Sequence, residues 1–367
     1  MEANGAWMRR WSMSPRAAFC VEEKRSPLYV PCLAAENAWL LSLTFLLLLS
    51  IPLYRRCRRT SSYGQPSYAF TAIRLTPTTF MLTEYDDIFD EHPQIFVKVV
   101  SSANTVLIID SGCGGKSARP AKTTSLRTFI EKAKLDCNGG VALNEGGRMD
   151  YVVVATHCHY DHILGIEQFT DSPILVSGHD ASFISPKNLP AHSLCQTLGL
   201  KTPQFKATLV SHAYQIRSVE DVPLNVQVLH TPGHTPDEVA LYDYSERMLY
   251  VGDTVYEVET IIFPSEGSIV QWMDSMQYLI AFVREQSGQT PVQLNAGHRT
   301  YSRPAMDVLI AARTFIEDVI AGREQVKDRM RRRGEENVRY EQGEGRFALL
   351  CPERLVLEAR DSGVAYR

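Results

Sequence analysis

Short apolar runs, rich in β-branched and aromatic residues, recur along the chain after residue 68, and most end in Gly, Pro or Asp. Runs of this length and composition are typical of buried β-strands bounded by turns. The runs at 105–110 and 151–156 are almost continuously apolar, which predicts strands buried on both faces. The predicted strands cover residues 71–85, 94–100, 105–110, 151–156, 173–177, 224–230, 239–244, 248–253 and 292–298.

Segments with helical spacing separate several of these strands. Residues 125–134 and 268–286 each place large apolar side chains on one face, which predicts two amphipathic helices. We also predict one long helix over 304–333, whose arginine run 329–333 would form a solvated helix end. Strands that alternate with helices favour an α/β fold over an all-β sandwich, with the functional site along the strand ends.

The N-terminal part has a different pattern. Residues 38–54 are uncharged and rich in leucine, and the basic run RRCRR follows at 55–59. We predict a transmembrane helix over 38–54, because about 17 residues is the lower limit for crossing a bilayer. Flanking arginines would place the catalytic domain on the cytosolic side. A buried helix and an extension absent from the mature chain remain alternatives.

The predicted organisation therefore has five parts. They are an N-terminal, poorly ordered extension (1–37), the hydrophobic helix (38–54), a basic and polar linker (55–67), a catalytic domain (68–333) and a C-terminal extension (334–367).

Charge and cysteine content narrow the classes of partner and compartment. A formal net charge of −4 indicates no basic surface for nucleic acid, so we expect no nucleic-acid partner. The eight cysteines are scattered and include no C-x-x-C pair, which favours reduced thiols in an intracellular protein.

The most informative segment is VVVATHCHYDHILG at 152–165. His157, His159 and Asp161 alternate, and side chains two positions apart in an extended chain point the same way. On a helix, His157 and His159 would point in nearly opposite directions, so the segment is not a helical zinc motif. His162 can join the cluster if the chain turns after Asp161. An isolated histidine is usually solvated or hydrogen-bonded, but this density of ligand-type residues favours a metal site.

Three further ligand candidates each follow their own predicted strand. His234 lies in a Pro-Gly turn, Asp253 follows Gly252, and His298 follows a glycine. Imidazole and carboxylate ligands in this mixture suit zinc, with iron or manganese as alternatives.

Taken together, these residues resemble the five-motif signature of the metallo-β-lactamase-fold hydrolase superfamily, over residues 68–327. Asp110 matches the first motif, and the segment 157–162 matches the second. The resemblance implies an αββα four-layer sandwich, in which two β-sheets pack together between helices, with a dinuclear metal site at one edge. It implies that His157, His159 and His234 hold one metal, that Asp161, His162 and His298 hold the other, and that Asp253 bridges them.

Asp253 also separates branches of this superfamily. Zinc β-lactamases normally lack the bridging carboxylate, so hydrolysis of antibiotics is not expected. The aspartate form looks like the glyoxalase-II, lactonase, thioesterase and phosphodiesterase members.

The resemblance implies two zinc ions per subunit, with Asp161 and Asp253 as the catalytic carboxylates. Two cations that share a water lower its pKa and provide a hydroxide nucleophile. Asp110 is predicted to accept a hydrogen bond from a ligand histidine, with a turn-forming aspartate as the alternative. Tyr256 is a candidate hydrogen-bond donor to an oxyanion, with simple packing as the alternative.

The function predicted from these residues is hydrolysis of an ester-like bond, namely a thioester, lactone or ester, in a small-molecule substrate. Residues 185–222 and 258–272 are expected to form a partly apolar substrate wall, which favours an acyl or apolar substrate. The alternatives are a phosphodiesterase or nuclease of the same fold and a mononuclear iron enzyme of the persulfide-dioxygenase type. A binding module without catalysis would be expected to have lost ligands, and all seven are present.

Overall fold

The computed structural model describes residues 67–118, 121–286, 288 and 290–366. The predicted N-terminal extension, the hydrophobic helix at 38–54 and nearly all of the linker lie outside these residues. Among the described residues, no helix has the length and apolar character needed to cross a bilayer.

The first sheet consists of seven strands, β1 (Phe70–Arg74), β2 (Thr79–Glu84), β3 (Gln94–Val100), β4 (Thr105–Ile109), β5 (Asp150–Val154), β6 (Ile174–Ser177) and β7 (Ala207–Val210). They are hydrogen-bonded in chain order. Pairing is antiparallel from β1 to β4 and parallel from β4 to β7. All five residues of β4 are buried, as its continuous apolar run predicts.

The second sheet has six strands in the spatial order β14 (Arg303–Pro304), β13 (Gln293–Asn295), β11 (Met248–Tyr250), β10 (Val239–Asp243), β9 (Pro223–His230) and β8 (Gln215–Arg217). Side chains of both sheets form one apolar cluster, in which Leu107 and Val152 from the first sheet join Val226 and Leu241 from the second. The two sheets therefore pack face to face.

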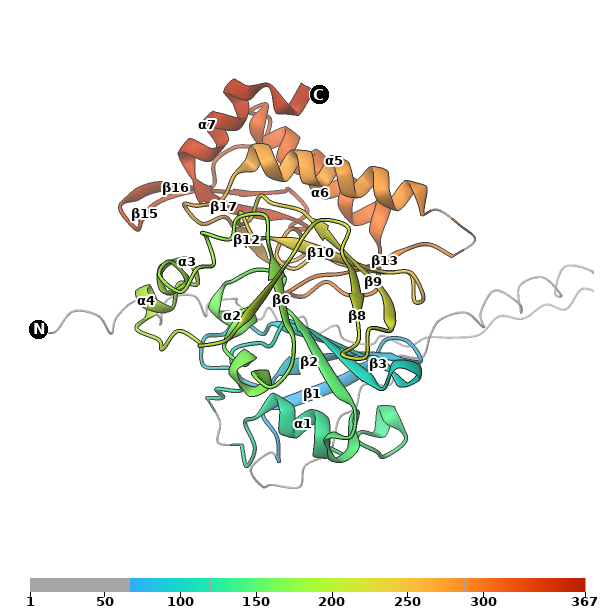
Figure 1. The fold of residues 1–367 in the computed structure, drawn as a ribbon. Coiled ribbons are helices and arrows are strands. Elements are labelled where there is room, and N and C mark those ends of the chain that lie inside the picture. The colour runs from blue at the N-terminus through green and yellow to red at the C-terminus, as the bar shows by residue number, and fades with distance from the viewer. Residues whose placement is uncertain (1–66, 119–120, 287, 289, 367) are drawn as a thin grey trace, which may run out of the picture. The chain divides into compact units, whose positions relative to one another are not determined.

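Helices cover the outer faces of these sheets (Figure 1). Helix α1 (Leu126–Lys132) begins at Ser125, whose hydroxyl accepts a hydrogen bond from the Thr128 N–H, and it packs on the first sheet. Helices α5 (Ile269–Glu285) and α6 (Ala305–Ile320) share a second apolar cluster with the second sheet. The other helices are α2 (Tyr160–Ile163), α3 (Leu189–His192), α4 (Cys195–Leu198) and the C-terminal α7 (Glu353–Ser362).

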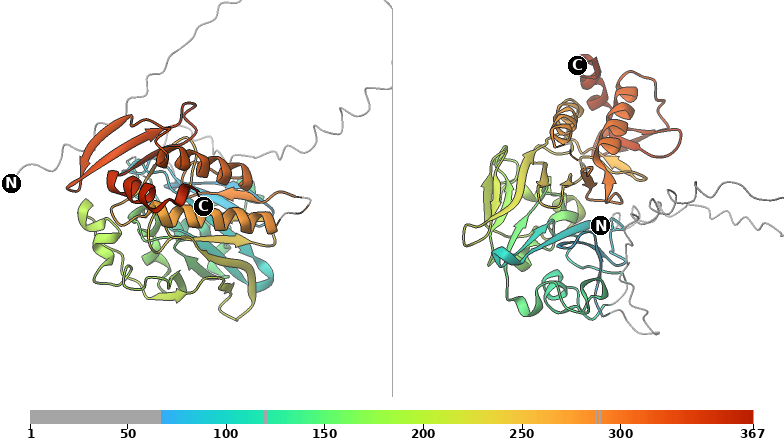
Figure 2. Two further views of the ribbon diagram at one scale, coloured as in Figure 1. Left: turned by 90° about the horizontal axis from the view of Figure 1, so that it is seen from above. Right: turned by 90° about the vertical axis from the view of Figure 1, so that its right-hand side faces the viewer.

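A third sheet is present that the sequence did not predict. Its four strands have the order β12 (Thr260–Ile262), β17 (Ala348–Pro352), β16 (Glu335–Glu341) and β15 (Asp328–Arg332). The β15–β16 hairpin projects beside the C-terminal helices (Figure 1, Figure 2). Strand β12 pairs parallel with β17, which joins the C-terminal strands to the middle of the chain.

The long helix predicted over 304–333 is therefore wrong in its second half. Helix α6 ends at Ile320, where the buried apolar stripe stops, and Gly322 adopts a left-handed conformation with φ of 73°. The arginine-rich residues that follow form β15 and its turn. Accordingly, the arginine run is not a helix end.

A buried ion pair joins the two large sheets. Lys98 on β3 donates from Nζ to Asp243 Oδ2 on β10, and both side chains are buried. Asp243 Oδ1 also accepts hydrogen bonds from the backbone N–H groups of Ser245 (2.9 Å) and Glu246 (3.1 Å). Removal of one partner from such a pair leaves an uncompensated buried charge.

We expect Lys98→Ala to lower the free energy of unfolding by about 3–5 kcal/mol, measured by urea denaturation. The double variant Lys98→Met/Asp243→Asn should lie closer to wild type, because it removes both charges and keeps the Oδ1 acceptor. A loss below about 1 kcal/mol in Lys98→Ala would contradict the importance of this pair.

Glu84, at the end of β2, is another buried residue with an ionisable side chain. Burial raises its pKa from the ordinary value of 4.5 to about 8, although the Gly115 N–H donates a hydrogen bond to Oε1 (3.2 Å). A folded-state pKa above the ordinary value means that the folded protein binds this proton more tightly than the unfolded chain does.

The contribution of Glu84 to the free energy of unfolding should therefore fall as the pH rises from 4.5 to 8. The contribution of Glu84 to this slope is at most about 1.4 kcal/mol per pH unit. Glu84→Gln should make the slope shallower, as measured by urea titrations over this range with a chelator in both samples. Equal slopes for the two proteins would show that Glu84 does not titrate in this window.

Candidate metal centre

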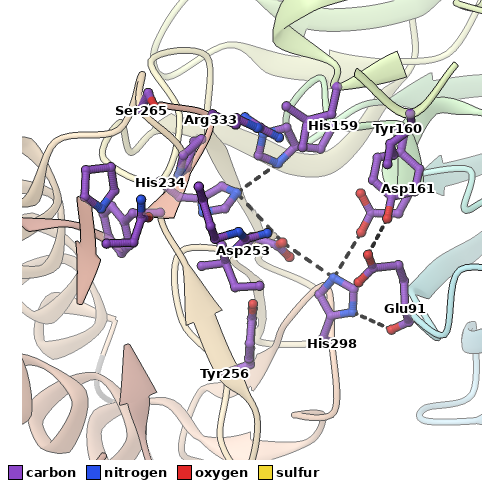
Figure 3. Close-up of a pocket in the computed structure, with 18 residues that line it drawn as sticks. Glu91, His159, Tyr160, Asp161, His234, Asp253, Tyr256, Ser265, His298 and Arg333 are labelled. Atoms are coloured by element: carbon purple, nitrogen blue, oxygen red, sulfur yellow. Dashed lines mark hydrogen bonds and ion pairs between the residues drawn. The ribbon is translucent and has the colours of Figure 1, made fainter. Parts of the chain in front are cut away.

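The predicted ligands follow strands of both large sheets and meet at one edge. His157 and His159 follow β5, Asp161 and His162 belong to α2, and the other three follow β9, β11 and β13. Figure 3 shows His159, Asp161, His234, Asp253 and His298 directed toward one another. All seven are buried, namely His157, His159, Asp161, His162, His234, Asp253 and His298.

His157, His159 and His234 form a first group that could hold a metal ion. The Nε2 atom of His157 lies 3.0 Å from His159 Nδ1, which in turn lies 3.1 Å from His234 Nε2. Burial lowers the pKa of all three imidazoles, to about 3 for His159 and about 4 for His234. Three neutral rings thus direct nitrogen atoms at a common point, as zinc ligands do.

Asp161, His162, Asp253 and His298 form a second group. Asp161 Oδ2 lies 3.5 Å from His162 Nε2 and 3.3 Å from His298 Nε2. Burial opposes charge on every member, but the two carboxylates raise the pKa of both imidazoles, which in turn lower the pKa of both carboxyls. A divalent cation can replace the protons on these imidazoles and keep the charges balanced.

Asp253, a member of the second group, also lies close to two histidines of the first group. Its Oδ2 lies 4.0 Å from His157 Nε2, 3.9 Å from His234 Nε2 and 3.5 Å from His298 Nε2. Its Oδ1 lies 3.4 Å from His162 Nε2, yet neither of these two buried atoms has a hydrogen-bond partner. Buried polar atoms are rarely left without a partner, so this donor set fits a metal ion as the missing partner.

Groups behind the ligands fix the orientation of the imidazole rings. Asp110 accepts hydrogen bonds from His162 Nδ1 (2.9 Å) and from the N–H (2.7 Å) and hydroxyl (2.9 Å) of Thr156. The backbone carbonyl of Glu91 accepts one from His298 Nδ1 (2.9 Å). Hydrogen bonds of this kind at Nδ1 leave Nε2 free to bind a metal.

Glu238 was not identified from the sequence, although it lies directly behind the first group. Its Oε2 is 3.5 Å from His157 Nδ1, and its Oε1 accepts a hydrogen bond from the Asp253 N–H (3.0 Å). Burial raises the pKa of Glu238 well above its ordinary value. The available signal was an acidic residue directly before the buried strand β10.

Two tyrosines line the pocket beside the ligands, and the hydroxyls of both bond to groups other than the ligands. The Tyr256 ring lies edge-on to His298 with centroids 5.3 Å apart, and its hydroxyl donates to the Thr260 carbonyl (3.2 Å). The Tyr160 hydroxyl donates to Glu91 Oε1. The oxyanion role of Tyr256 stays a prediction.

A pocket of about 220 Å³ opens above the two groups. Of the predicted apolar wall, Ile262 and Phe263 line the pocket, whereas Ile261, Ile269 and Trp272 are buried in the core. The remaining lining residues include members of α4, β15 and β16 as well as the ligands themselves. The pocket is lined by Glu91, His159, Tyr160, Asp161, Leu194, Leu198, His234, Asp253, Tyr256, Ile262, Phe263, Pro264, Ser265, His298, Arg332, Arg333, Asn337 and Pro352.

The backbone comes so close to the second group that only glycine fits at position 297. A Cβ added at Gly297 would lie 2.3 Å from Asp253 Oδ1 and 2.7 Å from His162 Cε1. Two ligands would have to move to accept it.

We expect Gly297→Ala to weaken metal binding by at least about tenfold, measured by competition with a chelating dye. Gly343→Ala is the matched control, because a Cβ there meets nothing within 4 Å. A Gly297→Ala protein with wild-type metal affinity would show that the close approach does not constrain the ligands.

The chain is similar to several known proteins. The sequence profile of the metallo-beta-lactamase superfamily matches residues 93–314. The chain is 33% identical over 312 residues to avaE of Aspergillus versicolor, which carries a provisional designation as a transcription factor; the match covers 81% of this chain and 90% of that protein. It is also 23% identical over 185 residues to the human acyl-coenzyme A thioesterase MBLAC2, covering 48% of this chain and 60% of that one.

Among solved structures, a metallo-beta-lactamase from Pontibacter korlensis is similar, with 18% identity and a TM-score of 0.46. The alignment covers 67% of this chain and 97% of that protein. The profile match spans more than half of the chain and contains every ligand of both groups. The chain therefore belongs to the metallo-beta-lactamase superfamily of metal-dependent hydrolases.

Proposed function

We propose that this protein is a dinuclear metal-dependent hydrolase that cleaves thioester bonds. The observation that carries the proposal is the position of Asp253, whose carboxylate lies within 4.0 Å of imidazoles from both ligand groups. A carboxylate that lies between two groups of ligands suits a pair of adjacent cations better than a single cation.

We propose a set of ligands for each ion. His157, His159 and His234 would hold the first, Asp161, His162 and His298 the second, and Asp253 both. Imidazole nitrogen and carboxylate oxygen without thiolate suit zinc, and also iron or manganese. We propose zinc at both positions.

When bound, two such ions acidify a water and polarise the carbonyl under attack. The chain's own residues prepare the site for this chemistry. Asp110 keeps the Nδ1 proton on His162, and the Glu91 carbonyl does the same for His298. Leu198 and Phe263 line the pocket with apolar surface that can hold an acyl chain and exclude water.

The similarity to MBLAC2 supports thioester hydrolysis over other reactions, because MBLAC2 is named as an acyl-coenzyme A thioesterase. We do not propose that this chain is a transcription factor. A transcription factor needs a surface that attracts the phosphate backbone, and a net charge of −4 argues against one.

The direct test uses the full chain loaded with zinc and a panel of thioesters, lactones and phosphodiesters. We expect thioesters to be the best substrates, and we expect Asp253→Asn to lower kcat by at least about a hundredfold with loss of bound metal. Asp274→Asn, which removes an exposed carboxylate on α5, should match wild type.

His298→Gln should show the same losses as Asp253→Asn. It serves as a second variant if circular dichroism shows that the Asp253→Asn protein does not fold. Full activity in a folded, metal-depleted Asp253→Asn protein would overturn the dinuclear assignment. Turnover of phosphodiesters without thioesters would overturn the substrate class.

A further inference from the structure

The turn between β15 and β16 carries an arginine in an uncommon conformation. Arg332 pairs with Glu335 in the ladder, so Arg333 and Gly334 form a two-residue turn. Both have positive φ, 48° for Arg333 and 82° for Gly334, as in a type I′ turn. Asn, Asp or Gly is preferred at the first of these positions, so an arginine there is not explained by the turn.

The side chains of Arg332 and Arg333 line the pocket of the metal centre. In Figure 3, Arg333 lies on the side of Ser265 and His159, away from Glu91. Arg329, on the same strand, is neutralised by Glu353 at 2.8 Å. Within the described part of the chain, the guanidinium groups of Arg332 and Arg333 form no hydrogen bond or ion pair that would neutralise them in this way.

The rest of the pocket wall is apolar on two sides. Leu194 and Leu198 come from the α3–α4 region, and Ile262, Phe263 and Pro264 come from β12 and the residues after it. An occupant that fits these walls has an apolar part beside the metal ligands and an anionic part at the two arginines. A guanidinium group binds carboxylate or phosphate oxygens through two parallel N–H donors.

We propose that Arg332 and Arg333 bind an anionic group of the substrate, so that this protein selects anionic acyl thioesters over neutral ones. The inference rests on the proposed thioester hydrolysis and adds a substrate class to it. The two arginines lie outside residues 93–314, where the superfamily profile matches, so this selectivity comes from the C-terminal hairpin.

The anionic group can belong to either half of the substrate. A carboxylate on the acyl chain and a phosphate on the thiol half present the same oxygen pattern to a guanidinium. Three substrates separate these sources, namely octanoyl-N-acetylcysteamine, which is neutral, suberyl-N-acetylcysteamine, with a carboxylate on the acyl chain, and octanoyl-coenzyme A, with phosphates on the thiol half.

The variants are Arg332→Gln/Arg333→Gln in the zinc-loaded full chain and Arg331→Gln as the control. Arg331 donates to the Gly334 carbonyl (3.4 Å) and does not line the pocket. We expect the double variant to raise KM about 10- to 100-fold for an anionic thioester, with kcat unchanged. KM for the neutral thioester and all constants of Arg331→Gln should stay at wild-type values.

A binding measurement keeps this inference separate from the proposed reaction. Coenzyme A and suberate are titrated calorimetrically into the same proteins, and the double variant should lose about 10- to 100-fold in affinity for one of them. If wild type hydrolyses no thioester but this loss is seen, the proposed function fails and the anion site stands. Equal KM and affinity in wild type and the double variant for every anionic compound would overturn the anion site.

Discussion

The constraint on which the structure depends is the convergence of buried imidazole and carboxylate groups, two of whose facing atoms have no hydrogen-bond partner. Three neutral imidazole nitrogens lie within 3.0–3.1 Å of their neighbours, and two atoms of the adjoining group lack any hydrogen bond. In a buried site such an arrangement is costly unless positive charge sits between the donors. Metal binding and the stability of this edge of the molecule are therefore coupled.

The rest of the fold holds the donors in place. Ends of strands from two packed sheets provide the ligands, and Asp110 and Glu238 hold the imidazoles from behind. The Lys98–Asp243 pair then joins the same two sheets through a buried contact. A shift of one sheet against the other would separate His157 from Asp253, so packing far from the pocket also maintains its geometry.

The structure brings the seven residues predicted as ligands into two groups that could hold metal ions, and their role as ligands stays a prediction. Alternation correctly brings His157 and His159 together, whereas Asp161 lies on helix α2 and belongs to the other group. The roles of Glu238 and of the Glu91 carbonyl were not predicted, because both depend on contacts between distant segments. The helix predicted over 304–333 was too long because β15 is a short, polar strand, stabilised by pairing with β16 rather than by an apolar stripe.

The ligands and part of the pocket wall come from different parts of the chain, because the parallel pairing of β12 with β17 adds C-terminal strands to the wall. Every ligand has been synthesised once residue 298 has been added to the chain. Part of the pocket wall, by contrast, comes from residues 332 to 352. A nascent chain thus contains every ligand residue before it contains the arginines of the β15–β16 hairpin. The β15–β16 hairpin, with the two arginines proposed to select the substrate, is made only after every ligand.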